Sequence, residues 1–563
     1  MHRETVTAIG MQSPASTWGR VIAWGVLVLV WFGSLGWRAL ISPDEGRYAT
    51  IALGMLQSGD WLTPRLNGLL YFEKPILQYW ISAGSLQVFG INEFAARLWP
   101  GLTGFLTIVA VALTARRLWD EQASHYAGLV AAGTAWIIIN SHFLSLDMGL
   151  TFFLTLALCG FLLAQRGGAS STEQRHAMWL CWAAMAGATL SKGLVGLVIP
   201  GATLVLYSLI QRQFDFWRRM HWLSGLMIYF ALTAPWFIAV SLKNPGFFDF
   251  FFVREHFRRF LTDEARRTGS IYYFVPYLLA GLLPWTTLLP GLLQRGGQRE
   301  HNTIFQPQRL LLIWSAFIFV FFSVSKSKLP SYILPMFPAL ALLAGRFLPQ
   351  IDPAQLKRHL LLPVVLWLPV LVAVPFVGRF VSPGAPLAVL EPFAYLLALA
   401  ATLFLLPAAI AWWLLGRGRK LAAMALVAFG SLLAVTVSLR GHDYYGSQLK
   451  SSKAIVPQLA SYLQADTEVF AVRYYEQTLP FYLRRPVTLV DYRDEFSFGQ
   501  EAEPSRWLPT LDAFIARWQT LPRAAAMMSR DTYQELQQRQ LPMRIAYQDP
   551  NRVVVVKPET VSR

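Results

Sequence analysis

The stretch Ser42-Pro43-Asp44-Glu45-Gly46-Arg47-Tyr48 is the most informative part of this chain, because it places charge directly beside a segment built for a bilayer. It follows an apolar run from about Val21 to Leu40, which is long enough to span a membrane. Proline stops the helix, so both carboxylates are held where the chain leaves the bilayer. Charge at this depth is costly and usually serves chemistry or transport. The run has no small-residue cleavage site, so we expect a retained helix rather than a signal peptide.

The composition is that of a polytopic membrane protein. Of 563 residues, 55% are hydrophobic and only 14% are charged, whereas soluble domains carry about a quarter charged residues. The net charge of +17 is better explained by basic loops and anionic lipid than by nucleic acid. The two cysteines, Cys159 and Cys181, lie in apolar stretches, which excludes a disulfide framework and a cysteine metal site. The chain shows no P-loop and no GxGxxG motif, so a nucleotide cofactor has no support.

Apolar runs along the chain predict about thirteen transmembrane helices. They lie near residues 20–40, 94–115, 123–139, 144–165, 176–190, 194–210, 221–242, 271–293, 309–324, 329–348, 360–379, 392–416 and 421–438. Alternate short loops are basic and contain few acids, so we expect them to be cytoplasmic. The remaining loops hold the acids and face outward, and an odd number of spans puts everything after Arg440 on that side as well.

The sequence therefore predicts two domains. Residues 1–440 form a transmembrane domain, with two outer amphipathic helices within about 42–92 and a long outer loop at 243–270. Residues 441–563 contain short apolar runs, such as Val469–Val472 and Ala524–Met528, between amphipathic helical patterns. This alternation is typical of a small soluble α/β domain. The predicted fold class is a polytopic α-helical membrane protein with a C-terminal α/β domain.

Three outward acids are candidates for the chemistry. Asp44 could accept a proton, orient a nucleophile or bind a metal, or it could simply cap the next helix. Glu73 precedes Lys74 and Pro75. Lys74 could pair with Glu73 or Asp44, or hold an anionic phosphate, or Glu73 and Lys74 could be only a solvated charge pair. Asp147 lies at membrane depth, where an acid is functional by default, although it could instead be the partner of a base such as Arg97 or Lys192.

Several basic residues are placed on the outer face, against the usual charge distribution. Lys192, Lys326 and Lys328 lie in short outer turns, where they either contact lipid phosphate or only extend to the interface. In the loop at 243–270, a run of aromatic residues is expected to insert at the bilayer surface. The guanidinium groups of that loop match phosphate oxygens. His256 could complete a metal site with a carboxylate such as Glu73, or be an ordinary hydrogen-bonded histidine.

Together these motifs resemble the membrane-embedded glycosyltransferases of the protein O-mannosyltransferase superfamily, which have the GT-C fold. The motifs are SPDEGRY at 42–48, GDW at 59–61, FEKP at 72–75, ARLWP at 96–100, LD at 146–147, SKG at 191–193 and KLPSYILP at 328–335. Within the superfamily the chain is most similar to the bacterial lipid A aminoarabinose transferases. The resemblance covers roughly residues 10–440 and is weaker over the C-terminal domain.

The resemblance implies roles for these residues. Asp44 is the main catalytic or acceptor-positioning acid, and Asp147 is a second acid. Glu73 also pairs with His256 as ligands of a divalent metal ion, zinc or magnesium. The contacts to lipid phosphate would come from Lys74, Arg258, Arg259, Tyr332, Lys192, Lys326 and Lys328.

The implied reaction moves 4-amino-4-deoxy-L-arabinose from a polyprenyl phosphate, such as undecaprenyl phosphate, to a lipid A phosphate. It would invert the anomeric carbon at the periplasmic face of the bacterial inner membrane. The product carries less negative charge, which implies resistance to polymyxin and other cationic peptides. Two alternatives remain: a lipid-linked sugar flippase, and a transferase with a protein or other glycan as acceptor. The sequence does not specify an oligomeric state.

Overall fold

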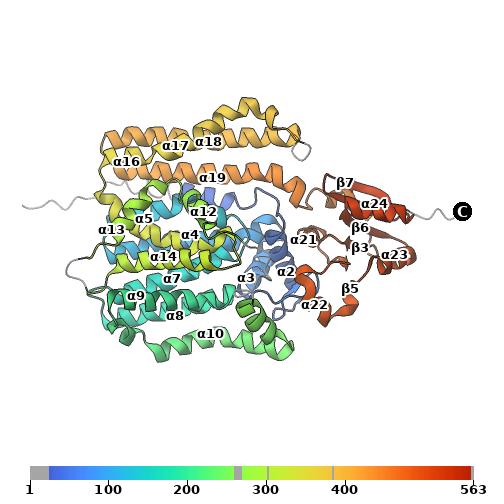
Figure 1. Ribbon diagram of the computed structural model, residues 1–563, viewed down its shortest axis with the longest axis horizontal. Coiled ribbons are helices and arrows are strands. Elements are labelled where there is room, and N and C mark those ends of the chain that lie inside the picture. The colour runs from blue at the N-terminus through green and yellow to red at the C-terminus, as the bar shows by residue number, and fades with distance from the viewer. Residues whose placement is uncertain (1–24, 259–268, 301–303, 383–385, 559–563) are drawn as a thin grey trace, which may run out of the picture.

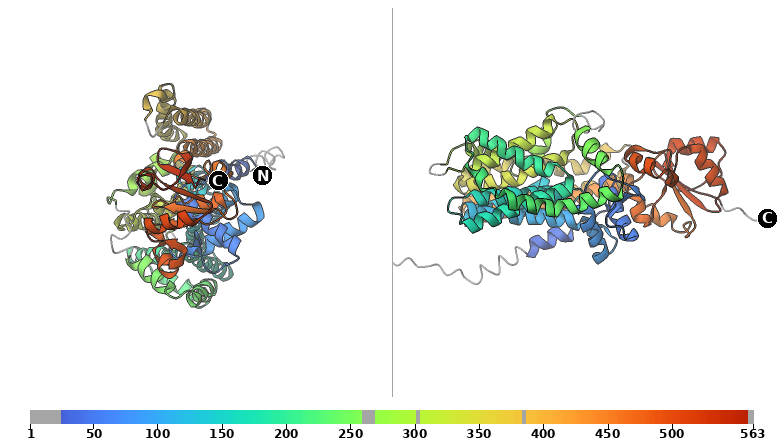
Figure 2. Two further views of the ribbon diagram at one scale, coloured as in Figure 1. Left: turned by 90° about the vertical axis from the view of Figure 1, so that its right-hand side faces the viewer. Right: turned by 90° about the horizontal axis from the view of Figure 1, so that it is seen from below.

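Three layers follow one another along the long axis of the molecule: a helical bundle, a pair of short helices, and a sheet domain (Figure 1). In this computed structural model, residues 25–258, 269–300, 304–382 and 386–558 are described, with only the backbone given for 255–258 and 443–449. The view from below shows the same order, with the pair of helices between the bundle and the sheet domain (Figure 2).

The bundle is built from helices that correspond to the predicted apolar segments. After a first helix at 25–33, its main helices are α4 (Glu93–Leu118), α5 (Glu121–Gly133), α6 (Ala135–Ser141), α7 (Asp147–Gln165), α8 (Ser171–Lys192), α9 (Val195–Gln211), α10 (Trp222–Lys243), α12 (Phe274–Gly281), α13 (Leu289–Gly296), α14 (Pro307–Val324), α15 (Phe337–Phe347), α16 (Pro353–His359), α17 (Leu361–Ala373), α18 (Leu387–Gly416) and α19 (Lys420–Lys450). A 3-10 helix, η5 (Pro330–Met336), precedes α15.

Fewer helices than predicted qualify as complete spans. Among the described residues, eight helices are long and apolar enough to cross a membrane, or nine if the bent pair α12 and α13 counts as one. The expected total of about thirteen is higher. The difference has physical causes: the helix is broken at Thr134 between α5 and α6, α8 opens with polar residues, α9 has 17 residues, and the first span begins outside the described residues. The polytopic helical fold itself is confirmed.

The middle layer consists of α2 (Asp44–Ser58) and α3 (Leu77–Phe89), joined through a small hairpin of β1 (Arg65–Leu66) and β2 (Leu69–Leu70). Both helices were expected from their amphipathic patterns. The side chains from Glu45 to Leu53 are all buried, however, because α2 lies between the bundle and the sheet domain. The C-terminal domain therefore packs on this layer.

The C-terminal domain is a six-stranded mixed sheet in the order β5-β4-β3-β6-β8-β7. Its strands are β3 (Glu468–Val472), β4 (Thr488–Val490), β5 (Trp507–Leu508), β6 (Ala524–Ser529), β7 (Arg544–Gln548) and β8 (Arg552–Val556). The pairs from β5 to β6 are parallel, whereas β8 is antiparallel to both of its neighbours. The helices α21 (Leu479–Leu483), α22 (Ser497–Ala502), α23 (Leu511–Thr520) and α24 (Arg530–Gln538) complete it. The expected α/β domain is confirmed.

The two faces of this sheet belong to different cores. Alternate strand residues such as Phe470 pack with Phe514 and Trp518 of α23. Their neighbours, such as Ala471, join the same core as Tyr79 of α3 and Tyr48 of α2. Because successive strand residues point to opposite faces, one sheet serves both cores. The C-terminal domain thus shares its hydrophobic interior with the middle layer.

The aromatic side chains of the long outer loop do not lie where the sequence predicts. We expected its aromatic residues to enter the bilayer surface, but Phe247, Phe250 and Phe251 are buried in the protein. The Phe247 ring lies 5.1 Å from Phe72, and the Phe250 ring lies 4.7 Å from Phe498 of α22. The π-helical segment η2 (Asp249–Arg258) carries part of this run. A run of aromatics satisfies a protein core as well as a bilayer, so composition alone could not separate the two.

Gly46 allows the sheet domain to approach α2 closely. A Cβ atom at Gly46 would lie 2.5 Å from the carbonyl carbon of Gln477 and 2.6 Å from the nitrogen of Thr478. These are backbone atoms, so they cannot move aside as the end of a flexible side chain could. The Thr50 hydroxyl donates a hydrogen bond to the Gln477 carbonyl at 3.1 Å, which fixes the same contact.

Substituting Gly46→Ala should push the sheet domain away from α2. Overpacking of this kind costs about 1–3 kcal/mol, so we expect a lower Tm of the purified protein in detergent and faster proteolysis between α19 and β3. Gly84→Ala is the control, since a Cβ there meets nothing within 4 Å. An unchanged Tm and unchanged proteolysis in Gly46→Ala would contradict the close approach.

Candidate active site

Glu45 is the centre of a buried ion cluster. Its carboxylate is completely buried and accepts hydrogen bonds from Arg38 at 2.7 and 2.8 Å and from Arg97 at 2.7 and 2.8 Å. The backbone N–H groups of Ile41 and Leu144 donate to the same carboxylate at 3.1 and 3.0 Å. Burial alone would raise the pKa of Glu45, but the two guanidinium groups lower it to about 2. Glu45 is therefore a structural group that is ionised at neutral pH.

Asp44 is held differently from its neighbour. It is the first residue of α2, and the cap position is Pro43, so Asp44 does not cap the helix as one alternative proposed. Its carboxylate remains about a quarter exposed and pairs with Arg47 at 2.9 Å. Asp44 is thus the carboxylate of the motif that stays accessible to solvent.

The structure brings Asp147, Lys192 and Tyr332 together. Asp147, at the start of α7, contacts the Lys192 ammonium and accepts a hydrogen bond of 2.7 Å from Ser331. The Lys192 Nζ atom lies 4.4 Å from the centre of the Tyr332 ring. Lys192 is also within electrostatic range of Asp44. Of the two bases considered as partners of Asp147, Lys192 is therefore the one observed.

Glu73 and Lys74 lie in the loop between β2 and α3. The Lys74 ammonium donates a hydrogen bond of 2.8 Å to the Glu73 carbonyl. Burial raises the pKa of Tyr71 and of Tyr79, and the nearby Glu73 carboxylate raises both further. This loop therefore borders the space between α2 and α3.

Lys326 and Lys328 have different surroundings although they share one turn. Lys326 is exposed, whereas Lys328 is buried. The Lys328 ammonium donates to the carbonyls of Ser323 and Ser325 at 2.6 and 2.8 Å. It thus satisfies backbone acceptors at the end of α14, and a phosphate would have to compete with these bonds.

The side chains of three predicted residues lie outside what the structure describes. Arg259 is one, and for His256 and Arg258 only the helix backbone is described. Among the described residues, no group of three His, Cys, Asp or Glu side chains could hold a metal ion. The Glu73–His256 metal pair and the two arginine contacts to phosphate stay predictions.

Arg47 links α2 to the sheet domain. Its guanidinium group lies 2.5 Å from the Glu495 carboxylate, in addition to its contact with Asp44. Glu495 also contacts the side-chain amide of Gln477. Burial raises the pKa of Glu495 to about 7, with Arg47 opposing this shift and Glu73 adding to it. The carboxylate of the sheet domain therefore faces the same space as the predicted acids.

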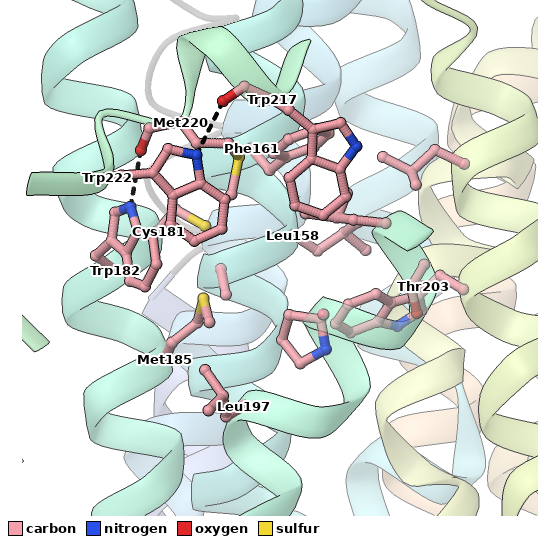
Figure 3. A pocket seen from close by; sticks show the side chains of 16 residues that line it. Leu158, Phe161, Cys181, Trp182, Met185, Leu197, Thr203, Trp217, Met220 and Trp222 are labelled. Carbon is pink, nitrogen blue, oxygen red and sulfur yellow. Dashed lines mark hydrogen bonds between the residues drawn. The ribbon is translucent and has the colours of Figure 1, made fainter. Parts of the chain in front are cut away.

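An apolar cavity lies among the helices of the bundle (Figure 3). It measures about 110 Å³ and is lined by α7, α8, α9, α10, α14 and the segment between α9 and α10, and its lining includes no charged side chain. The Trp182 indole donates to the Met220 carbonyl at 2.9 Å, and the Trp222 indole donates to the Trp217 carbonyl at 3.0 Å. Without a charged side chain in its lining, this cavity suits hydrocarbon rather than an anion.

Known proteins share this architecture. Residues 20–251 match the family model of dolichyl-phosphate-mannose-protein mannosyltransferases, and residues 455–557 match the aminoarabinose transferase C-terminal domain. The crystal structure of ArnT from Cupriavidus metallidurans bound to undecaprenyl phosphate superposes with a TM-score of 0.91 at 38% identity, covering 97% of this chain and 99% of that chain. The chain belongs to the ArnT family.

Other similarities are partial. The undecaprenyl phosphate-alpha-4-amino-4-deoxy-L-arabinose arabinosyl transferase of Erwinia tasmaniensis is 37% identical over 311 residues, which is 54% of this chain and 55% of that relative. The matched stretch therefore spans little more than half the length of this curated relative. An Archaeoglobus fulgidus oligosaccharyltransferase shares the fold alone, with a TM-score of 0.51 at 12% identity over 91% of this chain and 70% of that chain.

In this member of the ArnT family, sequence reasoning missed the ion pair between Arg47 and Glu495. Arg47 stands inside the quoted motif, so its position was visible but its partner was not. Glu495 lies among several acids in a soluble segment, Asp491–Glu501, and nothing in that pattern sets it apart. Only the docking of the sheet domain on α2 could have revealed the pair.

Substituting Glu45→Gln should strongly destabilise the protein. It would leave two buried guanidinium groups without their counter-ion, and breaking a buried ion pair costs about 3–5 kcal/mol. Thermal unfolding in detergent measures the effect, with the exposed Asp512→Asn as control. An unchanged Tm for Glu45→Gln would contradict this role.

The same cluster predicts a dependence on pH. The pKa of Glu45 is lowered from 4.5 to about 2. Since a lowered carboxyl pKa stabilises the folded state above its ordinary value, the contribution should be complete above pH 4.5 and disappear as pH falls through about 2. The difference in Tm between the original protein and Glu45→Gln should shrink over this interval.

Proposed function

We propose that this chain transfers 4-amino-4-deoxy-L-arabinose from undecaprenyl phosphate to a phosphate group of lipid A at the periplasmic face of the bacterial inner membrane. The observation that carries this proposal is the superposition on ArnT bound to undecaprenyl phosphate, which covers 99% of that chain at 38% identity. The cluster of acids and bases at the end of the bundle near α2 provides the chemistry such a reaction requires.

The reaction is a single displacement. An oxygen of the lipid A phosphate attacks the anomeric carbon, so a new C–O bond forms. The bond between that carbon and the donor phosphate oxygen breaks, and undecaprenyl phosphate leaves with the electron pair. The configuration at the anomeric carbon inverts. Both phosphates are largely ionised at neutral pH, so the main difficulty is to bring two anions together rather than to remove a proton.

Basic residues lower that electrostatic cost. Lys192 is held by Asp147 and lies against Tyr332, so its ammonium group has a fixed position. A cation placed in advance stabilises developing charge without further reorganisation. Asp147 then acts by positioning Lys192, and Lys74 supplies a second cation from the loop before α3. Asp44, about a quarter exposed, is the carboxylate that orients the acceptor or the sugar.

The sidedness follows from charge. Basic loops at one end of the bundle favour the cytoplasm. The middle layer of α2 and α3 lies together with the C-terminal domain, residues 441–563, at the opposite end of the bundle. Both would be periplasmic. A divalent ion held by Glu73 and His256 would add positive charge beside the phosphates. In this arrangement the transmembrane domain, residues 1–440, holds the lipids and the outer layers enclose the reacting groups.

Substituting Asp44→Ala should reduce sugar transfer by roughly 100-fold or more, because the reacting groups lose an orienting carboxylate. Purified protein with an undecaprenyl phosphate sugar donor and lipid A, followed by mass spectrometry of the lipid A, measures it. Asp60→Ala is the control, since Asp60 pairs with Lys243 at the surface. Full activity of Asp44→Ala would remove Asp44 from the mechanism. If the original protein translocates the donor but transfers no sugar, the chain is a flippase instead.

A further inference from the structure

The segment between α9 and α10, residues 212–222, carries positive charge that the protein itself does not neutralise. It holds Arg212, Arg218 and Arg219 against a single acid, Asp215. The side chains of all three arginines are exposed. Within the part of the chain that the structure describes, none of the three guanidinium groups forms an ion pair. We call this segment the basic loop, and its arginines are available to an anionic partner.

The basic loop lies at the membrane surface opposite the middle layer. At the far end of α10, Lys243 pairs with Asp60 of the middle layer at 2.8 Å. Since α10 has 22 residues, its first turn lies about 33 Å from that contact, which is close to the thickness of a hydrocarbon core. The rings of Phe214 and Trp222 are 57% and 45% exposed. Aromatic side chains of this kind favour the interface between membrane and water.

The same loop forms part of the wall of the apolar cavity. Trp217, Met220 and Trp222 line the cavity beside residues of α8 and α9 (Figure 3). The lining contains four tryptophans, and every indole N–H donates to the protein: Trp182 to Met220, Trp217 to Ser208, Trp222 to Trp217, and Trp314 to Pro335. The rings therefore have no free donor to offer a ligand. Apolar cavities of this kind stay dry and accept hydrocarbon.

The cavity is open to a chain that comes from the bilayer. Two of its lining residues, Leu197 and Trp222, are exposed at the surface of the bundle. Gly201 of α9 also lines it, and a Cβ atom at Gly201 would meet nothing within 4 Å. There is thus unfilled space beside α9, next to a surface that faces lipid.

We propose that the basic loop and the apolar cavity together bind one anionic phospholipid, with its phosphate on Arg218 and Arg219 and an acyl chain in the cavity. The two arginines lie between Trp217 and Met220, which both line the cavity. The site for the phosphate therefore begins one residue from the site for the chain. Guanidinium groups match phosphate oxygens, and anionic lipid is attracted to clustered arginines. This site is separate from the transfer reaction.

The arginines distinguish this lipid from the polyprenyl carrier. Lys192, which is proposed to face the carrier phosphate, lies 13 residues along α8 from Trp179, or about 20 Å. The Trp179 indole donates to Ser224 in the first turn of α10, at 3.0 Å. One phosphate therefore does not reach both Lys192 and the basic loop. A polyprenyl chain in the cavity would leave the arginines without an anion, whereas a phospholipid satisfies both parts of the site.

The first experiment measures the Tm of delipidated full-length protein in detergent. Phosphatidylglycerol and phosphatidylcholine with the same acyl chains are titrated separately, since a lipid that binds the folded state raises Tm. Phosphatidylglycerol should act at lower concentration. The double variant Arg218→Gln/Arg219→Gln should raise its half-saturating concentration about tenfold or more and abolish the preference. The control Arg116→Gln/Arg117→Gln removes two exposed arginines at the end of α4 and should keep the preference.

A second variant tests the cavity. Gly201→Leu places a side chain in the unfilled space, so both lipids should bind about tenfold more weakly because the acyl chain loses apolar burial. Gly291→Leu is the matched control: Gly291 lies in α13, and a Cβ atom there also meets nothing within 4 Å. Its lipid binding should equal that of the original protein.

The following outcomes overturn the proposal. Equal stabilisation of the original protein by both lipids does so, and so does an unchanged preference in the arginine variant or unchanged binding to Gly201→Leu. If undecaprenyl phosphate displaces phosphatidylglycerol and Gly201→Leu prevents its binding, the cavity belongs to the carrier instead. The arginine variant changes only exposed side chains, so it decides the question even where Gly201→Leu does not fold.

Discussion

The burial of one carboxylate between two guanidinium groups organises the rest of this structure. Glu45 joins Arg38, after the first helix, to Arg97 in α4, and it also accepts from the backbone of Leu144 before α7. Arg38 donates in turn to the His142 carbonyl at 2.7 Å. A buried charge is tolerated only when every partner is present, so these segments must meet in one arrangement. The outer end of the bundle is thereby held in register before any substrate binds.

The helix geometry of α2 sets the directions of the residues next to Glu45, and these residues form part of the candidate site. Successive residues of an α-helix point about 100° apart, so fixing Glu45 inward sets the direction of its neighbours. Asp44 is left partly exposed, Gly46 lies against the backbone of Gln477, and Arg47 points to Glu495. Four consecutive residues therefore lie in four different environments. This explains why a short motif can be so informative while the part played by each residue stays hidden in the sequence.

Sequence reasoning succeeded where the signal was local or compositional. Hydropathy located the helical segments, alternation located the C-terminal α/β domain, and depth in the membrane identified Asp147, whose partner Lys192 was one of two bases considered. It did not identify Glu45 as an anchor, because two adjacent acids are equivalent until a helix orients them. It placed Phe247 and Phe251 at the bilayer surface, since a bilayer and a core attract the same side chains. Arg47 and Glu495 are too far apart in the chain for any pattern to pair them.

The shared core makes the sheet domain part of the site rather than an appendage. One face of the sheet packs on its own helix α23, but the other packs with Tyr48 and Tyr79 of the middle layer. Undocking would therefore expose apolar surface of both partners to water, which is costly in proportion to its area. The same movement would withdraw Tyr475 and Glu495 from Arg47. Hydrophobic packing has no chemical specificity, but here it holds in place polar groups that have it. The sheet domain thus adds to the membrane bundle a polar surface that lipid-facing residues could not provide.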